Sequence, residues 1–235
     1  NDGVAAQLVI DGSNGTDTVE VSGSVSDMGN GTYLVRFVAE MAGVYSVRAS
    51  VNGEAAGSGA AMSVNIGHAG AVSDTAVVTG SGLDLATAGS LGSFGVTARD
   101  EFGNRVQVAG GAVLASMTLV NSSYTREVSV SDASNGQYGL EYTVTISGVY
   151  SLAVSGFGGS LPGSPFDVAV LPAGVAAGAS SAEGGGLSVA TAGVLSSMSV
   201  TARDEFGNLK TQGGDLFSVS VEFANAVNAS ALPMQ

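Results

Sequence analysis

The eight-residue sequence TARDEFGN occurs twice, at residues 97–104 and again at residues 201–208, 104 residues later. An identity of this length at that spacing indicates a duplicated structural unit. Alternating apolar residues precede the motif and Gly-Asn ends it, so it predicts a buried strand that runs into a polar turn. The chain is therefore expected to fold as repeated units of about 100 residues rather than around one core.

Other motifs repeat in step with this one. With both positions given for each, they are GL at 82–83 and 186–187, ATAG at 86–89 and 190–193, D-x-x-N-G-x-Y at 27–33 and 132–138, and GVYS at 43–46 and 148–151. Residues 69–172 hold every motif and form one complete repeat. Residues 1–68 contain only the second part of a repeat, and residues 173–235 contain only the first part. We expect the chain to be a segment of a longer tandem array.

Residues 69–172 show the alternation of apolar and polar residues that is typical of half-buried strands. Seven strands are expected, near residues 81–85, 93–99, 112–120, 125–130, 137–145, 149–155 and 165–171. The residues expected to face inward are Leu83, Phe94, Val96, Tyr138, Leu140, Tyr142, Tyr150, Leu152, Val154, Phe166, Val168 and Val170. Seven short strands in about 100 residues predict an immunoglobulin-like β-sandwich, so the fold class is all-β.

The motifs together resemble a known family. In chain order they are GSGLDLATAG, F-x-V-x-A-R-D-x-F-G-N, D-x-x-N-G-x-Y, S-G-V-Y-S-L-x-V and P-G-S-P-F-D-V-x-V, and they look like the filamin-type immunoglobulin repeat. The first copy departs at its last motif, where GSGA at 57–60 stands in place of GSPF at 163–166. The resemblance covers the whole chain. It implies tandem filamin-type β-sandwich repeats with structural roles that dock partner peptides.

The third expected strand, residues 112–120, is predicted to form an edge of the smaller sheet. Its sequence AVLASMTLV contains no Lys, Pro or inward charge of the kind that protects exposed edges. If the odd-numbered residues face the core, Leu114, Ser116 and Thr118 face outward. We predict that a partner peptide adds a strand beside these three residues, or that a neighbouring repeat or chain covers them. The family resemblance implies partner binding at the same place.

Charge and composition argue against several classes of partner. The net charge is −13 and only 7 Lys and Arg side chains are scattered along the chain, so nucleic acid and anionic membranes are not expected to bind. The longest apolar run, residues 168–179, is interrupted by Pro172 and is shorter than the about 20 residues of a membrane-spanning helix. The chain has no Cys, which is compatible with a reducing compartment.

Few residues could carry out chemistry. His68 is the single His, and no nucleophile, His and carboxylate combination can be assembled around it. The acidic pairs Asp100-Glu101 and Asp204-Glu205, from the two copies of TARDEFGN, could bind Ca²⁺ through their carboxylates. The favoured interpretation is a polar turn whose carboxylate is solvated or hydrogen bonded to backbone. We therefore expect no enzyme activity, no cofactor and no metal site in this segment.

Four Asn residues begin sequons for N-linked glycosylation: Asn14, Asn30, Asn121 and Asn228. Three of them, all except Asn30, fall near the same expected hairpin, once in each copy of the repeat. Modification would require a secretory route. The alternative is that Asn-Gly and Asn-Ser are ordinary turn residues.

Two functions follow. The first is a non-catalytic structural or scaffolding segment, a rod-like spacer of the cytoskeleton or cilium. It would meet protein partners by strand addition or by packing between repeats within a larger assembly. The second is a glycosylated adhesion or filament array at the cell surface or outside the cell. If the protein were an enzyme, these repeats would be accessory and its active site would lie outside the segment.

Overall fold

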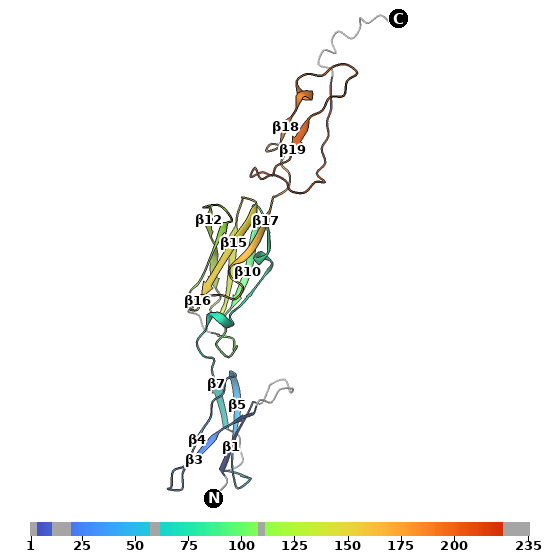
Figure 1. Ribbon diagram of the computed structural model, residues 1–235. Helices are drawn as coiled ribbons and strands as arrows, with labels where there is room; N and C mark the ends of the chain where they lie inside the picture. Colours follow the sequence, from blue (N-terminus) through green and yellow to red (C-terminus); the bar gives the residue numbers. More distant parts are fainter. Residues whose placement is uncertain (1–3, 11–19, 57–61, 108–110, 223–235) are drawn as a thin grey trace, which may run out of the picture. The chain divides into compact units, whose positions relative to one another are not determined.

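The structure is a computed structural model that describes residues 4–10, 20–56, 62–107 and 111–222 (Figure 1). The chain divides into two compact units, residues 1–171 and residues 172–235. Within the first unit we distinguish the first segment, residues 1–68, from the middle segment, residues 69–171. The described residues contain strands and three short 3₁₀ helices but no α-helix, which confirms the predicted all-β class.

The middle segment is a sandwich of two sheets. One sheet has the strand order β13-β14-β10-β8, and the other has the order β12-β11-β15-β17-β9, with β16 paired to β15. β9 runs parallel to β17, and all the other pairs are antiparallel. The strands are β8 (Val77–Thr79), β9 (Leu85–Thr87), β10 (Leu91–Thr97), β11 (Val113–Leu119), β12 (Thr125–Glu127), β13 (Ser129–Asp132), β14 (Gln137–Thr143), β15 (Gly148–Gly156), β16 (Gly159–Ser160) and β17 (Phe166–Leu171).

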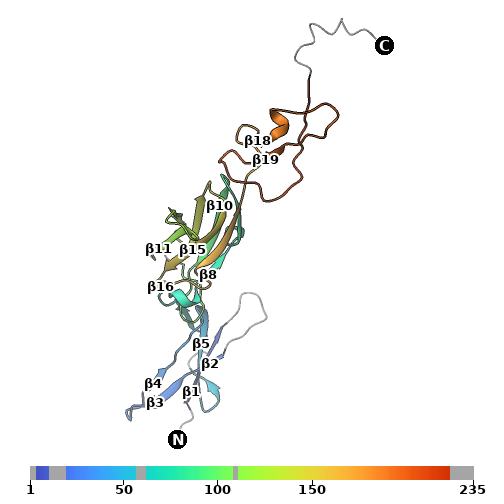
Figure 2. The same ribbon diagram turned by 45° about the horizontal axis from the view of Figure 1, so that its top comes forward.

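The core lies between these two sheets, which pack face to face (Figure 2). Every residue predicted to face inward is buried except Phe166, which is partly buried against the core. Among the residues that the structure describes, no buried side-chain polar atom lacks a hydrogen-bond partner: the Tyr142 hydroxyl, for example, donates a hydrogen bond of 2.5 Å to the carbonyl of Gly82. The period-two pattern therefore placed the side chains correctly, because each strand buries one face only.

Two predicted strands differ from the observed ones, because the chain changes sheet at or beside them. The first, expected near residues 81–85, is a 3₁₀ turn, η2 (Ser81–Leu83), that separates β8 in one sheet from β9 in the other. The buried Gly82 lies so close to the next strand that a Cβ there would come within 2.6 Å of the Ser93 carbonyl. The fourth, expected at 125–130, changes sheet at the buried Val128, between β12 and β13. A second 3₁₀ turn, η1 (Ser73–Thr75), precedes β8.

The first segment repeats the second part of this arrangement. β5 pairs with β1, β6 and β7, β1 pairs with β2, and β3 forms a hairpin with β4. The bounds are β1 (Val4–Ile10), β2 (Glu20–Ser22), β3 (Ser24–Asp27), β4 (Tyr33–Arg36), β5 (Gly43–Val51), β6 (Glu54–Ala55) and β7 (Met62–Ile66). The pairing of β1 with β2 and β5 matches that of β11 with β12 and β15. The duplication seen in the sequence is therefore a duplication of strand pairing.

The second unit repeats the opening of the middle segment. β18 (Ser181–Glu183) pairs with β19 (Ser199–Thr201), and the 3₁₀ turn η3 (Gly185–Leu187) lies between them. An isolated bridge between Val175 and Asp204 matches the bridge between Ala71 and Asp100. The boundaries at 68/69 and 172/173 that the motifs suggest remain predictions.

Candidate functional site

The predicted docking strand is β11, and its outward face is as expected. Val113 and Met117 are buried, whereas the Leu114 side chain is 66% exposed. However, β11 is not the outermost strand: β12 pairs with it from Ser116 to Thr118. The predicted edge position is therefore wrong for Ser116 and Thr118. The cause is the short connection between the two strands, which turns at Asn121 (φ 60°) and returns the chain directly alongside β11.

The part of β11 that β12 leaves uncovered is its beginning. Among the described residues, no strand pairs with Val113 or Leu114 on the side of β11 that faces away from β15. On that side the next residue, Ala115, is already bonded, because its carbonyl accepts from the Val128 amide at 3.2 Å. The Leu119 amide donates to the Tyr124 carbonyl, on the side of β12, and the Val120 amide donates to the Val149 carbonyl of β15. Because amide directions alternate along a strand, the Ser116 amide also points toward β15. A short edge beside Leu114 is thus what remains for an added strand.

The two sequons within the described residues lie in exposed turns. Asn121 is exposed between β11 and β12. Asn30 is exposed between β3 and β4, where its side-chain oxygen accepts hydrogen bonds from the Thr32 amide (3.1 Å) and hydroxyl (2.5 Å). Asn14 and Asn228 lie outside the described residues. Neither Asn30 nor Asn121 is needed for core packing, so both remain candidate sites of modification.

The turn of the first TARDEFGN copy is built around the carboxylate of Asp100, which is fully buried. Its Oδ1 accepts hydrogen bonds from the amides of Phe102 (3.1 Å) and Asn104 (2.8 Å). Its Oδ2 accepts from the amide of Ala69 (2.8 Å) and from the Asn104 side-chain amide (2.9 Å). Four donors therefore satisfy this carboxylate, as the polar-turn interpretation predicted, and they tie the start of the middle segment to the end of β10.

These contacts set the protonation of Asp100. Burial raises the pKa of the carboxyl, but the hydrogen bonds from Asn104, Ala69 and Phe102 together outweigh burial, so the pKa lies below its ordinary value of 3.8. The network therefore holds a charged carboxylate at neutral pH.

The same turn recurs in the second unit. Asp204 is also fully buried. Its carboxylate accepts hydrogen bonds from the amides of Phe206, Asn208 and Ala173 at 3.0, 2.8 and 2.9 Å, and from the Asn208 side chain at 2.7 Å. Its pKa is likewise lowered by these hydrogen bonds in spite of burial. The letters TARDEFGN thus encode one defined turn.

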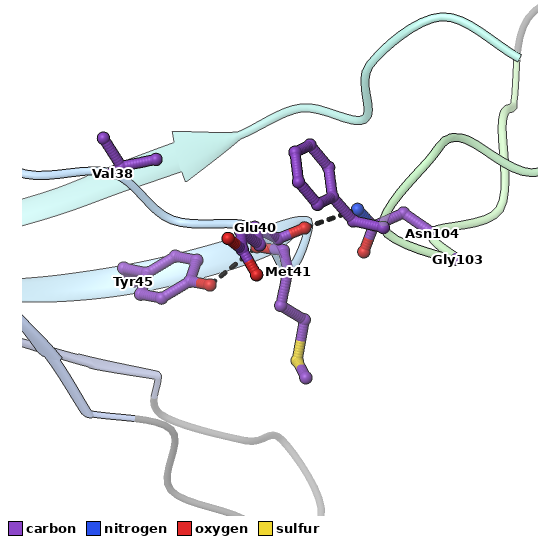
Figure 3. Close-up of a pocket in the computed structure, with 7 residues that line it drawn as sticks. Val38, Glu40, Met41, Tyr45, Gly103 and Asn104 are labelled. Carbon is purple, nitrogen blue, oxygen red and sulfur yellow. Dashed lines mark hydrogen bonds between the residues drawn. The ribbon is translucent and has the colours of Figure 1, made fainter.

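Asn104 also contacts the first segment (Figure 3). Its Nδ2 donates to the Glu40 carbonyl at 2.6 Å, and its Oδ1 accepts from the Ala42 amide at 2.8 Å. The loop that it meets is anchored from its own side, because the buried Tyr45 hydroxyl donates to the Met41 carbonyl at 2.6 Å. One side chain therefore pairs with backbone donor and acceptor groups of the preceding segment.

A pocket of ≈ 450 Å³ lies beside this contact, and its lining residues are Val38, Glu40, Met41, Tyr45, Phe102, Gly103 and Asn104. The sequence motifs did not reveal the contact. The Tyr of GVYS holds the loop in both copies, because the hydroxyls of Tyr45 and Tyr150 each donate to the carbonyl four residues earlier. That bond is the tyrosine-corner arrangement of β-sandwiches.

Other polar residues offer no reactive arrangement in the described part of the chain. His68 is half-buried, with Nδ1 2.8 Å from the Ala69 carbonyl and Nε2 accepting from the Gln107 amide at 3.2 Å. Within the described ranges, no three His, Asp or Glu side chains are grouped so that they could hold a metal ion. No helix among the described residues is long and apolar enough to cross a membrane.

Comparison with known proteins identifies the middle segment. Residues 71–167 match the family model of the Filamin/ABP280 repeat. No curated protein sequence matches the chain. Among solved structures, the Escherichia coli adhesin FdeC is similar, with 22% identity, a TM-score of 0.57, and coverage of 90% of this chain and 65% of the FdeC chain. At 22% identity, this likeness concerns the fold alone.

Two further structures are similar over part of their length or of this chain. The Lin-41 filamin domain has 20% identity and a TM-score of 0.38, over 43% of this chain and 97% of that domain. InvD of Yersinia pseudotuberculosis has 18% identity and a TM-score of 0.45, over 89% of this chain and 62% of its own. The chain thus spans less than two thirds of the FdeC and InvD structures. The matched family model and the observed sandwich agree, and residues 71–167 are a filamin-type immunoglobulin-like repeat.

Proposed function

We propose that the chain is a non-catalytic structural segment of a tandem-repeat protein, a spacer that also docks protein partners. The observation that carries this proposal is the recurrence of one turn network at Asp100 and Asp204. A unit repeated together with its internal contacts adds length to a protein and does not by itself assemble reactive groups. The filamin-type repeat is a structural, non-catalytic class of domain, which supports the proposal.

The docking surface that we propose is the short edge at the beginning of β11, beside Leu114, which β12 does not cover. An added strand would use the backbone that β12 leaves unpaired, and Leu114 would supply an exposed apolar contact. Partners would be protein segments in extended conformation. Resemblance to filamin favours a cytoskeletal or ciliary setting within a larger assembly.

Leu114→Lys is expected to weaken binding of extended peptides, or self-association of the chain, by about tenfold or more, because it places a charge in the apolar contact. Peptide-panel binding and sedimentation velocity would measure this. Val149→Lys is the matched control, since Val149 is 49% exposed but lies on the interior strand β15. Equal binding by both folded variants would contradict docking at this edge. A proline at Ser116 is unsuitable because its amide faces β15.

The second candidate is a glycosylated array outside the cell. The exposure of Asn121 and Asn30 in turns favours it, and so does the fold likeness to FdeC, which is described as an adhesin. In the native protein, this function predicts hexose-sized mass increments on the peptides that contain Asn121 and Asn30, measured by mass spectrometry. Ser123→Ala removes the Asn121 sequon and should abolish the increment on that peptide alone. Unmodified peptides would favour the cytoskeletal or ciliary setting.

A further inference from the structure

The side chain of Asn104 has an arrangement that folding of the middle segment alone does not require. Its Nδ2 and Oδ1 reach the Glu40 carbonyl and the Ala42 amide, which are 64 and 62 residues away in the sequence. A side-chain amide that donates and accepts in this way is hydrogen bonded to a backbone carbonyl and to a backbone amide at the same time. The contact therefore depends on the conformation of the loop at residues 40–42 as well as on the position of Asn104.

Both sides of the contact are held in place by buried groups. On one side, the Asp100 carboxylate fixes Asn104 through its backbone amide and its side-chain amide. On the other side, the Tyr45 hydroxyl fixes Met41, the residue between Glu40 and Ala42. Preorganisation of this kind lowers the entropy that is lost when two surfaces meet.

The linking chain is tied to the same point. The Ala69 amide donates to Asp100 Oδ2, and the preceding His68 accepts from the Gln107 amide through Nε2. One carboxylate thus holds the linker, the turn and the contacting Asn104 together. An ordinary polar turn would need none of the bonds to residues 40–42.

We propose that Asn104 and the loop at residues 40–42 form a specific joint between consecutive repeats, in which Asp100 positions Asn104 and Tyr45 positions the loop. The partner of this surface is the backbone of the preceding repeat, and the joint restrains movement between the turn and the loop. The inference gives the proposed spacer a mechanism for stiffness. The role of the joint in the protein rests on the proposed spacer function, but the hydrogen bonds of the joint can be measured directly.

Hydrogen exchange of the Ala42 amide in the whole chain, followed by NMR, tests the joint. In Asn104→Ala the exchange of this amide should accelerate by about tenfold, because its acceptor is removed, while the amide of Leu140 in the core stays protected. Asn208→Ala alters the matching residue of the second unit and should leave Ala42 unchanged. Unchanged exchange at Ala42 in Asn104→Ala would overturn the joint and would leave the docking proposal standing.

A second variant separates the joint from damage to the turn. If the Phe102 amide, which donates to Asp100, also exchanges faster in Asn104→Ala, the turn itself has loosened. Tyr45→Phe then decides, because it removes only the bond to Met41 and lies outside the turn. Faster exchange at Ala42 with an unchanged Phe102 amide supports the joint, and unchanged exchange at both amides overturns it.

Discussion

Gly136→Ala is expected to lower the free energy of unfolding of the middle segment by about 3–5 kcal/mol. Gly136 is buried in the turn between β13 and β14 and has a φ of 76°, a conformation that costs other residues about 1–2 kcal/mol. A Cβ there would lie 1.6 Å from the Val106 carbonyl oxygen, so the backbone must move as well. Thermal unfolding followed by circular dichroism would measure the loss, since the chain has no Trp.

The first segment supplies the matched control for this change. Gly31 occupies the same place in D-x-x-N-G-x-Y and has a φ of 82°, but a Cβ there would meet nothing within 4 Å. Gly31→Ala should therefore cost only the backbone strain, about 1 kcal/mol, and should leave the middle segment unaffected. If the two variants lose the same free energy of unfolding, the close contact with the Val106 carbonyl does not contribute to the cost of Gly136→Ala.

The interior of the sandwich could be predicted from the sequence because it depends on local alternation. Tyr150, Leu152 and Val154 occupy alternate positions of β15, so all three enter the core whatever the register of the neighbouring strands. Repetition added the rest of the evidence, because a strand recognised in one copy supports its counterpart in another. The fold class followed from these two signals.

The points where strands change sheet could not be predicted in this way. The alternation continues through Val128, so the sequence reads 125–130 as one strand, yet β12 and β13 belong to different sheets. The same is true near Gly82, where a close approach to Ser93 replaces a strand by a 3₁₀ turn. Both breaks are set by packing between the sheets, which a local pattern does not contain.

The candidate site was predictable to a similar extent. The outward face of Leu114 followed from alternation, and Asn-Ser at 121–122 indicated a hairpin after β11, but the turn residues do not show that the following strand covers Ser116–Thr118. Asp100 could be assigned to a polar turn because Gly-Asn follows it. The bonds from Asn104 to the first segment could not be predicted, since contacts across 62 or 64 residues leave no mark in a single sequence.

Asp100→Ala should destabilise the middle segment by about 2–4 kcal/mol. The change leaves the partly buried amides of Ala69, Phe102 and Asn104 without their acceptor, whereas a fully buried donor that loses its partner costs about 1–3 kcal/mol. The expected total is below the sum of three such costs because water can reach a collapsed turn. Urea or thermal unfolding of the whole chain, with the transition of the middle segment identified by hydrogen exchange, would measure it.

Glu101→Ala is the control for Asp100→Ala, because Glu101 is exposed in the same turn and should change stability by no more than about 0.5 kcal/mol. Acid supplies a second readout. The pKa of Asp100 is lowered in the folded state, so its stabilising contribution is present above the unfolded pKa of about 4 and is lost as the pH falls below it. Glu101→Ala should retain this acid sensitivity, and Asp100→Ala should unfold with a shallower dependence on pH between about 5 and 2. If the two variants have the same stability at neutral pH and the same acid dependence, the four hydrogen bonds of the Asp100 carboxylate do not stabilise the repeat.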